Sequence, residues 1–193
     1  MRRLEDTASC RQLNASYRHF AIPDCIYRQG GDDGHWLYAT EAALMGSLQA
    51  DDSRVVAALC DELAATLPDL AVLVCPLAIG GHVDHRLTSA TVEQLFHKSS
   101  SGRKWSLWYY ADYPYVVRDS SQLAGIAAEG GTVTTFAISQ NGLIAWGKAV
   151  AAHRSQISTF WSDMDAMQAA LQEYVRGSGG VRLWLPIKNE QTF

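Results

Sequence analysis

Apolar positions along the chain follow extended and helical patterns in turn, which is typical of an α/β fold. Leu70 to Leu77 is a continuous apolar run, as expected of a central strand buried on both faces of a parallel sheet. From Asp84 to His97 the apolar residues recur near helical spacing, so this stretch is predicted as an amphipathic helix. The other expected elements are helices over about 3–14 and 52–66, strands over about 19–27, 105–111 and 132–138, a long helix over about 143–176, and a strand over 181–185.

The alternation predicts a parallel α/β sheet, and the length of 193 residues suits a single domain over 1–193. Hydrophobic residues make up 48% of the chain, enough for a sizeable core. A net charge of −4, with no basic run longer than Arg2-Arg3, argues against binding to nucleic acid or to a membrane surface. The start of the chain lacks the apolar core of a signal peptide, so we expect a cytoplasmic protein.

The residues from Gly80 to Leu87 place two imidazoles and a carboxylate between the predicted strand and the predicted helix. His82, Asp84 and His85 are therefore expected at the carboxyl end of a strand, where the ligand-binding sites of open α/β sheets lie. The paired glycines allow the backbone to bend sharply and to approach a ligand closely. This junction is the first candidate for a functional site.

The spacing of the motif fits a metal site in part. His82 and His85 are three residues apart and can face the same side, with Asp84 near enough to orient an imidazole. One His-x-Asp-His segment nevertheless falls short of the three protein ligands that a catalytic zinc usually takes. The alternative is that Asp84 only caps the helix and that both histidines are bystanders.

The motif and four further segments resemble the LmbE-like/PIG-L family of zinc-dependent de-N-acetylases. The motif resembles the family's Gly-His-x-Asp-His element, and Arg2 to Leu13 resembles its Arg-x-x-Glu helix, although Asn14 stands where glycine is usual. The other similar segments, in the family's order, are Ile22–Cys25, Trp108–Tyr115 and Lys148–Gln156. The resemblance implies a Rossmann-like, mostly parallel sheet with helices on both faces.

The resemblance also predicts a difference from the family. No His-Pro-Asp-Asp-Glu motif, which supplies two zinc ligands and the general base in the family, occurs in the chain. We therefore expect an N-terminally shortened form that lacks a β-α-β portion on the order of 30 residues or more. The catalytic site is then incomplete unless other parts of this chain, or another chain, supply the missing groups.

Site roles follow from the resemblance alone. It implies that His85 binds zinc and that His82, held charged by Asp84, stabilises the oxyanion formed during amide hydrolysis. Asp112 and Tyr113, which follow an aromatic strand, are carried over as substrate-binding residues. The implied function is zinc-dependent N-deacetylation of an N-acetylated sugar conjugate or similar small molecule, inactive if the shortened site stays incomplete.

Two alternatives stay open: a non-catalytic relative that binds carbohydrate or another small molecule, and a half-protein completed by a separate chain or by a homo-oligomer. Among other candidate ligands, Asp32, Asp33 and His35 are better explained as a solvated glycine-rich turn. The isolated histidines are predicted to be surface or helix-face residues; they are His19, His97 and His153. The four cysteines lack paired-ligand spacing and are predicted to be free thiols, mostly buried.

Overall fold

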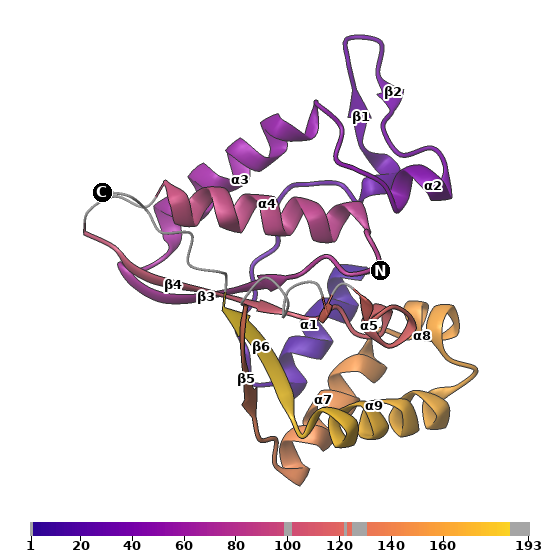
Figure 1. Ribbon diagram of the computed structural model, residues 1–193. Helices are drawn as coiled ribbons and strands as arrows, with labels where there is room; N and C mark the ends of the chain where they lie inside the picture. Colours follow the sequence, from indigo (N-terminus) through magenta and orange to yellow (C-terminus); the bar gives the residue numbers. More distant parts are fainter. Residues whose placement is uncertain (1, 99–101, 122, 125–130, 186–193) are drawn as a thin grey trace. The chain divides into compact units, whose positions relative to one another are not determined.

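The computed structural model describes residues 2–98, 102–121, 123–124 and 131–185 (Figure 1). The chain divides into two compact units. Unit 1 comprises residues 1–21 and 135–182, and unit 2 comprises residues 22–134 and 183–193. The single-domain organisation stays a prediction.

A four-stranded sheet in the order β3-β4-β6-β5 forms the framework of the fold. Strands β3 (Leu70–Pro76) and β4 (Lys104–Tyr110) are parallel, with Leu70 opposite Lys104 and Pro76 opposite Tyr110. Strand β6 (Val181–Leu185) runs antiparallel to β4, and β5 (Thr132–Phe136) lies beyond it. The mixed α/β fold with a mostly parallel sheet is thus confirmed.

Strand β3 lies at the edge of the described sheet, so its prediction as a central strand buried on both faces is wrong for this part of the chain. Leu73 and Cys75 point into the core and are buried. Leu70, Val72 and Val74 point to the opposite face and are 74%, 65% and 45% exposed. An apolar run predicts burial of both faces only if something covers each of them.

Two helices cover the core face of β3 and β4. Helices α3 (Asp52–Thr66) and α4 (Val83–His97) lie side by side there (Figure 1). The buried positions of α4 repeat every four residues and face the sheet, as the amphipathic pattern predicts; they are Val83, Leu87, Thr91 and Leu95. The core between these layers contains Cys60, Leu73, Cys75, Leu95 and Leu107.

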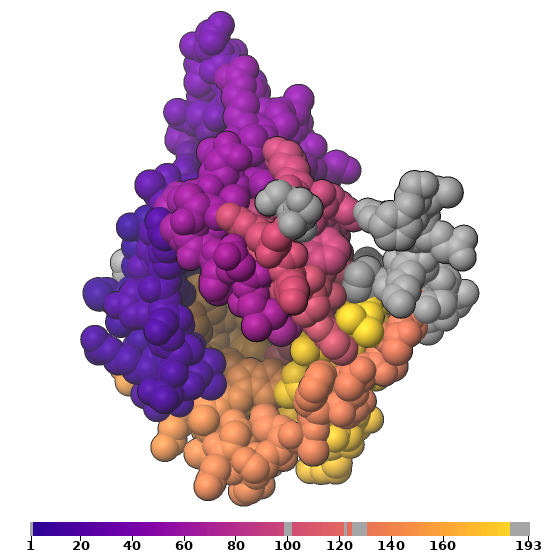
Figure 2. Space-filling view, turned by 90° about the vertical axis from the view of Figure 1, so that its left-hand side faces the viewer, coloured from indigo at the N-terminus to yellow at the C-terminus, as the bar shows by residue number. Residues whose placement is uncertain are grey.

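The first part of unit 2 is a looped segment rather than the strand predicted over about 19–27. It holds the 3-10 helix η1 (Cys25–Tyr27), a short hairpin of β1 (Gln29–Gly30) and β2 (His35–Trp36), and helix α2 (Glu41–Leu44). Pro23 lacks a backbone N–H, which disfavours a paired strand at this point. The hairpin forms the narrow tip of unit 2 in both views (Figures 1 and 2).

Unit 1 is helical apart from its share of the sheet. Helix α1 (Arg2–Gln12) packs against α7 (Gln140–Ala152), which is followed by α8 (Arg154–Phe160) and α9 (Met164–Ser178). The single long helix predicted over about 143–176 is thus three helices. Asp163 begins α9 by accepting a hydrogen bond from the Ala166 N–H at 2.8 Å, a capping signal that overrides the apolar pattern. None of the described helices is long and apolar enough to cross a membrane.

Candidate metal centre

The loop after β3 bends back through two glycines in the left-handed region, Gly80 at φ 86° and Gly81 at φ 78°. A Cβ on Gly80 would lie 2.9 Å from the Tyr115 ring, so glycine is required there for space as well as for conformation. Helix α4 then starts at Val83, and the N-cap residue before it is His82, whose Nδ1 accepts a hydrogen bond from the Asp84 N–H at 3.3 Å. The capping residue is His82 and not Asp84, which corrects the alternative drawn from the sequence.

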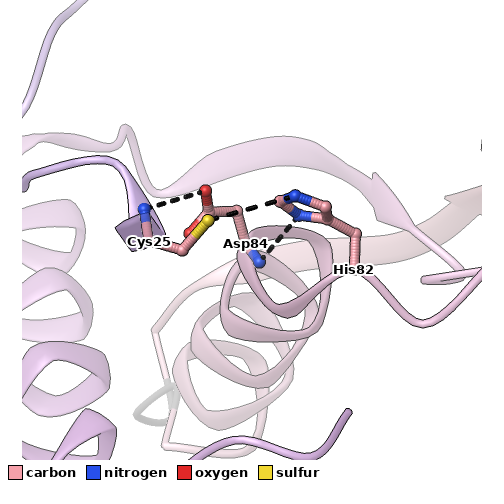
Figure 3. A group of neighbouring side chains, drawn as sticks. All are labelled: Cys25, His82 and Asp84. Atoms are coloured by element: carbon pink, nitrogen blue, oxygen red, sulfur yellow. Dashed lines mark hydrogen bonds between the residues drawn. The ribbon is translucent and has the colours of Figure 1, made fainter. Parts of the chain in front are cut away.

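Three potential ligands converge beside this loop: Cys25, His82 and Asp84 (Figure 3). Their donor atoms all lie within 4.8 Å of one another. Cys25 Sγ lies 4.0 Å from His82 Nε2, and the Cys25 N–H donates to Asp84 Oδ2 at 3.4 Å. Cys25 comes from η1, and the other two residues come from the start of α4. The fold thus joins two segments that are almost 60 residues apart in the sequence.

Asp84 is held by a buried cation. Arg28 donates to Asp84 Oδ1 through Nη2 and to Asp52 Oδ1 through Nη1 at 2.7 Å. Asp52 also accepts hydrogen bonds from the Tyr38 hydroxyl and, at 3.0 Å, from the Gln49 N–H. Arg28 and Asp52 are 3% and 1% exposed, so this ion pair is almost free of water. The network fixes the carboxylate end of the cluster.

Burial sets the charges at the cluster. It is the main cause that raises the pKa of the Cys25 thiol to about 12, with the negative charge of Asp84 adding to the rise. Burial also lowers the pKa of His82, against a smaller opposite effect of Asp84. Without a metal, Cys25 is therefore a neutral thiol and His82 a neutral imidazole near pH 7. The expectation that Asp84 holds His82 charged does not fit this geometry, because the Asp84 carboxylate bonds to Arg28 and Cys25 instead.

A second acid and imidazole pair stands next to the cluster. His85 Nδ1 lies in hydrogen-bond contact with Asp112 Oδ1, and Asp112 Oδ2 accepts from the Ile79 N–H at 2.9 Å. Asp112 is 1% exposed, whereas the His85 side chain is 33% exposed. The His82 and His85 rings lie 5.4 Å apart between centroids, which agrees with their expected common side. Asp112 thus fixes the ring and leaves Nε2 of His85 for other partners.

The donor set of the cluster fits zinc by chemical type. Thiolate, imidazole and carboxylate are the three ligand types that zinc takes in proteins, and three protein ligands leave one position for water or substrate. The carboxylate oxygens of Asp84 keep further lone pairs beyond those used by Arg28 and Cys25. Among the described residues this is the one group of three or more such side chains whose donor atoms lie this close together.

Tyr113 is half-buried beside Asp112, before α5 (Tyr115–Arg118). His35, the first residue of β2, pairs at 2.9 Å with Asp33 in the exposed turn before it, which confirms that turn. Cys25 was not predicted from the sequence as a candidate ligand. The thiol is free and buried as predicted, but its nearness to His82 depends on a tertiary contact. The segment Ile22–Cys25, which resembles a family segment, was the one signal for it.

Comparison with known proteins gives three solved structures. A zinc-inhibited form of teicoplanin deacetylase Orf2 is 24% identical over 99% of this chain and 75% of its own, with a TM-score of 0.78. A deacetylase complex from teicoplanin biosynthesis is 24% identical over 99% and 74%, with a TM-score of 0.76. A triple mutant of such a deacetylase is 20% identical over 99% and 72%, with a TM-score of 0.69. No protein-family model and no curated protein matches the chain. The chain therefore has the fold of these deacetylases, which are of the LmbE/PIG-L type, and the resemblance expected from the sequence is confirmed at the level of the fold.

Proposed function

We propose that this protein is a zinc-dependent N-deacetylase that hydrolyses the amide of an N-acetylated amino sugar or a similar small molecule. One observation carries the proposal: Cys25, His82 and Asp84 converge beside the carboxyl end of β3, in a fold shared with a teicoplanin deacetylase. Ligand sites of open α/β sheets lie at this end of the strands. The substrate class is proposed from the resemblance and from the named substrate of the neighbour.

In the proposed site, Cys25, His82 and Asp84 would hold the metal. Bound zinc supplies a Lewis acid that polarises a carbonyl and lowers the pKa of water. Arg28 keeps the Asp84 carboxylate in place, and the Cys25 N–H bonds to the same carboxylate. These contacts hold Asp84 and Cys25 in position in the absence of a metal.

His85 is proposed to move the proton that amide hydrolysis requires. The reaction adds the oxygen of water to the acetyl carbon, breaks the C–N bond and leaves a proton on the amine nitrogen. Because Asp112 holds Nδ1 of His85, Nε2 is the ring atom that can take this proton from water and deliver it to the amine. The resemblance assigns zinc binding to His85 and charge stabilisation to His82, which is the reverse of these roles.

A second candidate function is small-molecule binding without catalysis, and the hydrogen bonds of the cluster favour it. Both oxygens of Asp84 accept hydrogen bonds from protein donors, so the cluster is held together without a metal. Zinc on His82 Nε2 would move the ring proton to Nδ1, which now accepts from the Asp84 N–H at 3.3 Å. That capping bond would be lost on metal binding.

The assay that separates these functions is release of a primary amine from N-acetylglucosamine conjugates, measured with and without a chelator. We expect zinc-dependent turnover in the wild type and its loss in Cys25→Ser, while the control Cys60→Ala, at a buried core cysteine, stays active. His82→Ala is expected to lose zinc, and His85→Ala to keep zinc but lose turnover. The reverse pattern in the two histidine variants would favour the roles taken from the resemblance. Binding of the conjugate without turnover in zinc-loaded protein would favour the second function.

A further inference from the structure

A separate group of metal-ligand side chains lies in unit 1: Asp6, His19 and His153. Asp6 is on α1, His19 is in the segment after α1, and His153 lies between α7 and α8. His19 Nε2 is 3.4 Å from Asp6 Oδ2, and His153 Nδ1 is 3.7 Å from Asp6 Oδ1. Two imidazoles thus flank one carboxylate, each beside a different oxygen. Their prediction as separate surface or helix-face residues overlooked this contact.

These contacts are too long for good hydrogen bonds. An N–H···O bond usually measures about 2.7–3.2 Å, and His19 Nε2 is buried without a hydrogen-bond partner in the described part of the chain. Two ligands that share one zinc ion at bond lengths of about 2.0–2.1 Å in tetrahedral geometry lie about 3.4 Å apart. Each imidazole is therefore spaced from its own Asp6 oxygen much as one ligand is from another around an ion. The three donor atoms do not all lie within 4.8 Å of one another, so an ion would have to draw them together.

The backbone around this group is fixed by other residues. Glu5, next to Asp6, accepts hydrogen bonds from the Ser155 N–H at 2.9 Å and from the Ser155 hydroxyl at 2.7 Å. Helix α1 is thereby tied to the start of α8, two residues after His153, without help from Asp6. Helix α1 thus has a contact to this junction that does not involve Asp6.

Asp6 and His153 are open to solvent, whereas His19 Nε2 is buried within the group. The group lines a surface cavity of about 290 Å³ that also includes Cys10, one helical turn after Asp6. The side chains of His19, His153 and Asp6 are 25%, 33% and 43% exposed. Side chains with this much exposure can rotate, and such a rotation is needed to bring both imidazoles onto one ion.

We propose that Asp6, His19 and His153 form a second metal site, which binds a divalent transition metal of the Zn²⁺, Co²⁺ or Ni²⁺ class. Two imidazoles and one carboxylate are a donor set that these ions take, with water completing the coordination. The ion would join α1 to the α7/α8 junction and stabilise unit 1 by binding only the folded chain. The site is independent of the proposed catalytic centre, which lies in unit 2.

Metal counting tests the proposal on the untagged full chain, by Co²⁺ titration followed through visible absorption and by calorimetry. We expect two equivalents in the wild type, one in Cys25→Ser/His82→Ala, and none when His153→Ala is added to that variant. His97→Ala, at an exposed histidine on α4, is the matched control and should keep both equivalents. In Cys25→Ser/His82→Ala, added Zn²⁺ should raise the melting temperature, and His153→Ala or His19→Ala should abolish this rise.

The count also separates the two proposals. If the catalytic centre binds no metal, the wild type should hold one equivalent, and His153→Ala alone should remove it. If the double variant does not fold, a drop of one equivalent from wild type to His153→Ala still supports the second site. An unchanged metal count and an unchanged melting temperature in both His19→Ala and His153→Ala would overturn it.

Discussion

Arg28 is the residue on which the order of the candidate metal centre depends, because one buried guanidinium contacts both Asp52 and Asp84. The guanidinium carbon of Arg28 also lies 5.0 Å from the centre of the Tyr38 ring, which adds a cation–π contact. Removing the cation takes the ion-pair partner away from the buried Asp52 and leaves the Tyr38 hydroxyl and the Gln49 N–H as its donors. Arg28→Met should lower the free energy of unfolding by about 3–5 kcal/mol.

Urea denaturation would measure this loss. The control is Arg54→Met, at an exposed position of α3, which should change stability by no more than about 0.5 kcal/mol. Equal stabilities of the two variants would show that the buried ion pair does not hold this region together.

Asp112 is the second residue with a specific expected effect, through its contact with His85 Nδ1. Asp112→Asn keeps the size of the side chain but removes the carboxylate that orients the His85 ring. In the proposed reaction, turnover should fall by on the order of 10²–10⁴ while the zinc content stays the same. Loss of zinc together with turnover would instead indicate that His85 is a metal ligand supported by Asp112.

At the scale of the element, strand β3 has one buried face and one exposed face. Leu73→Ala on the core face should cost about 2–5 kcal/mol of stability, because Leu73 packs among Cys60, Leu95 and Leu107. Val72→Thr on the 65% exposed face should stay within about 0.5 kcal/mol of the wild type. Chemical denaturation of both variants checks this contrast, and a large loss from Val72→Thr would mean that another surface covers this face in solution.

Helix α1 gives unit 1 a pH-dependent contact through Glu5. Hydrogen bonds from Ser155, first the hydroxyl and then the backbone N–H, lower the pKa of the Glu5 carboxyl below its ordinary value of 4.5. A depressed pKa contributes stability that is present above 4.5 and is lost as pH falls through the lower folded value. Glu5→Gln should therefore lower stability near neutral pH and flatten the acid limb of the stability curve. Unfolding free energies measured across the acid range, with identical slopes for both proteins, would contradict this role.

Local patterns predicted the elements well where one face packs on a core. The repeat of Val83, Leu87, Thr91 and Leu95 gave α4 correctly, and the apolar run gave β3. The prediction of one long helix over about 143–176 was wrong because the apolar pattern continues across the points where one helix ends and the next begins. Such points are set by local capping hydrogen bonds, which the apolar pattern does not reveal. The edge position of β3 could not be predicted, since it depends on which strands pair with it.

Over the whole chain, the motif at the end of β3 and the resemblance predicted the fold and pointed to two of the three residues of the candidate centre, His82 and Asp84. His82, Asp84, His85 and Asp112 do lie together, as their positions after two neighbouring parallel strands suggest. Cys25 could not be found in this way, because it lies in a looped segment with no periodic pattern. For the same reason the contacts of His19 and His153 with Asp6 require the fold.

If Cys25 belongs to a metal centre with His82 and Asp84, its removal must change the zinc content of the protein. The measurement is elemental analysis of the untagged wild type and of Cys25→Ser after identical loading and dialysis, with Cys60→Ala as the control. We expect Cys25→Ser to hold one zinc fewer per chain than the wild type, while the control matches the wild type. Equal zinc content in Cys25→Ser and the wild type would contradict it.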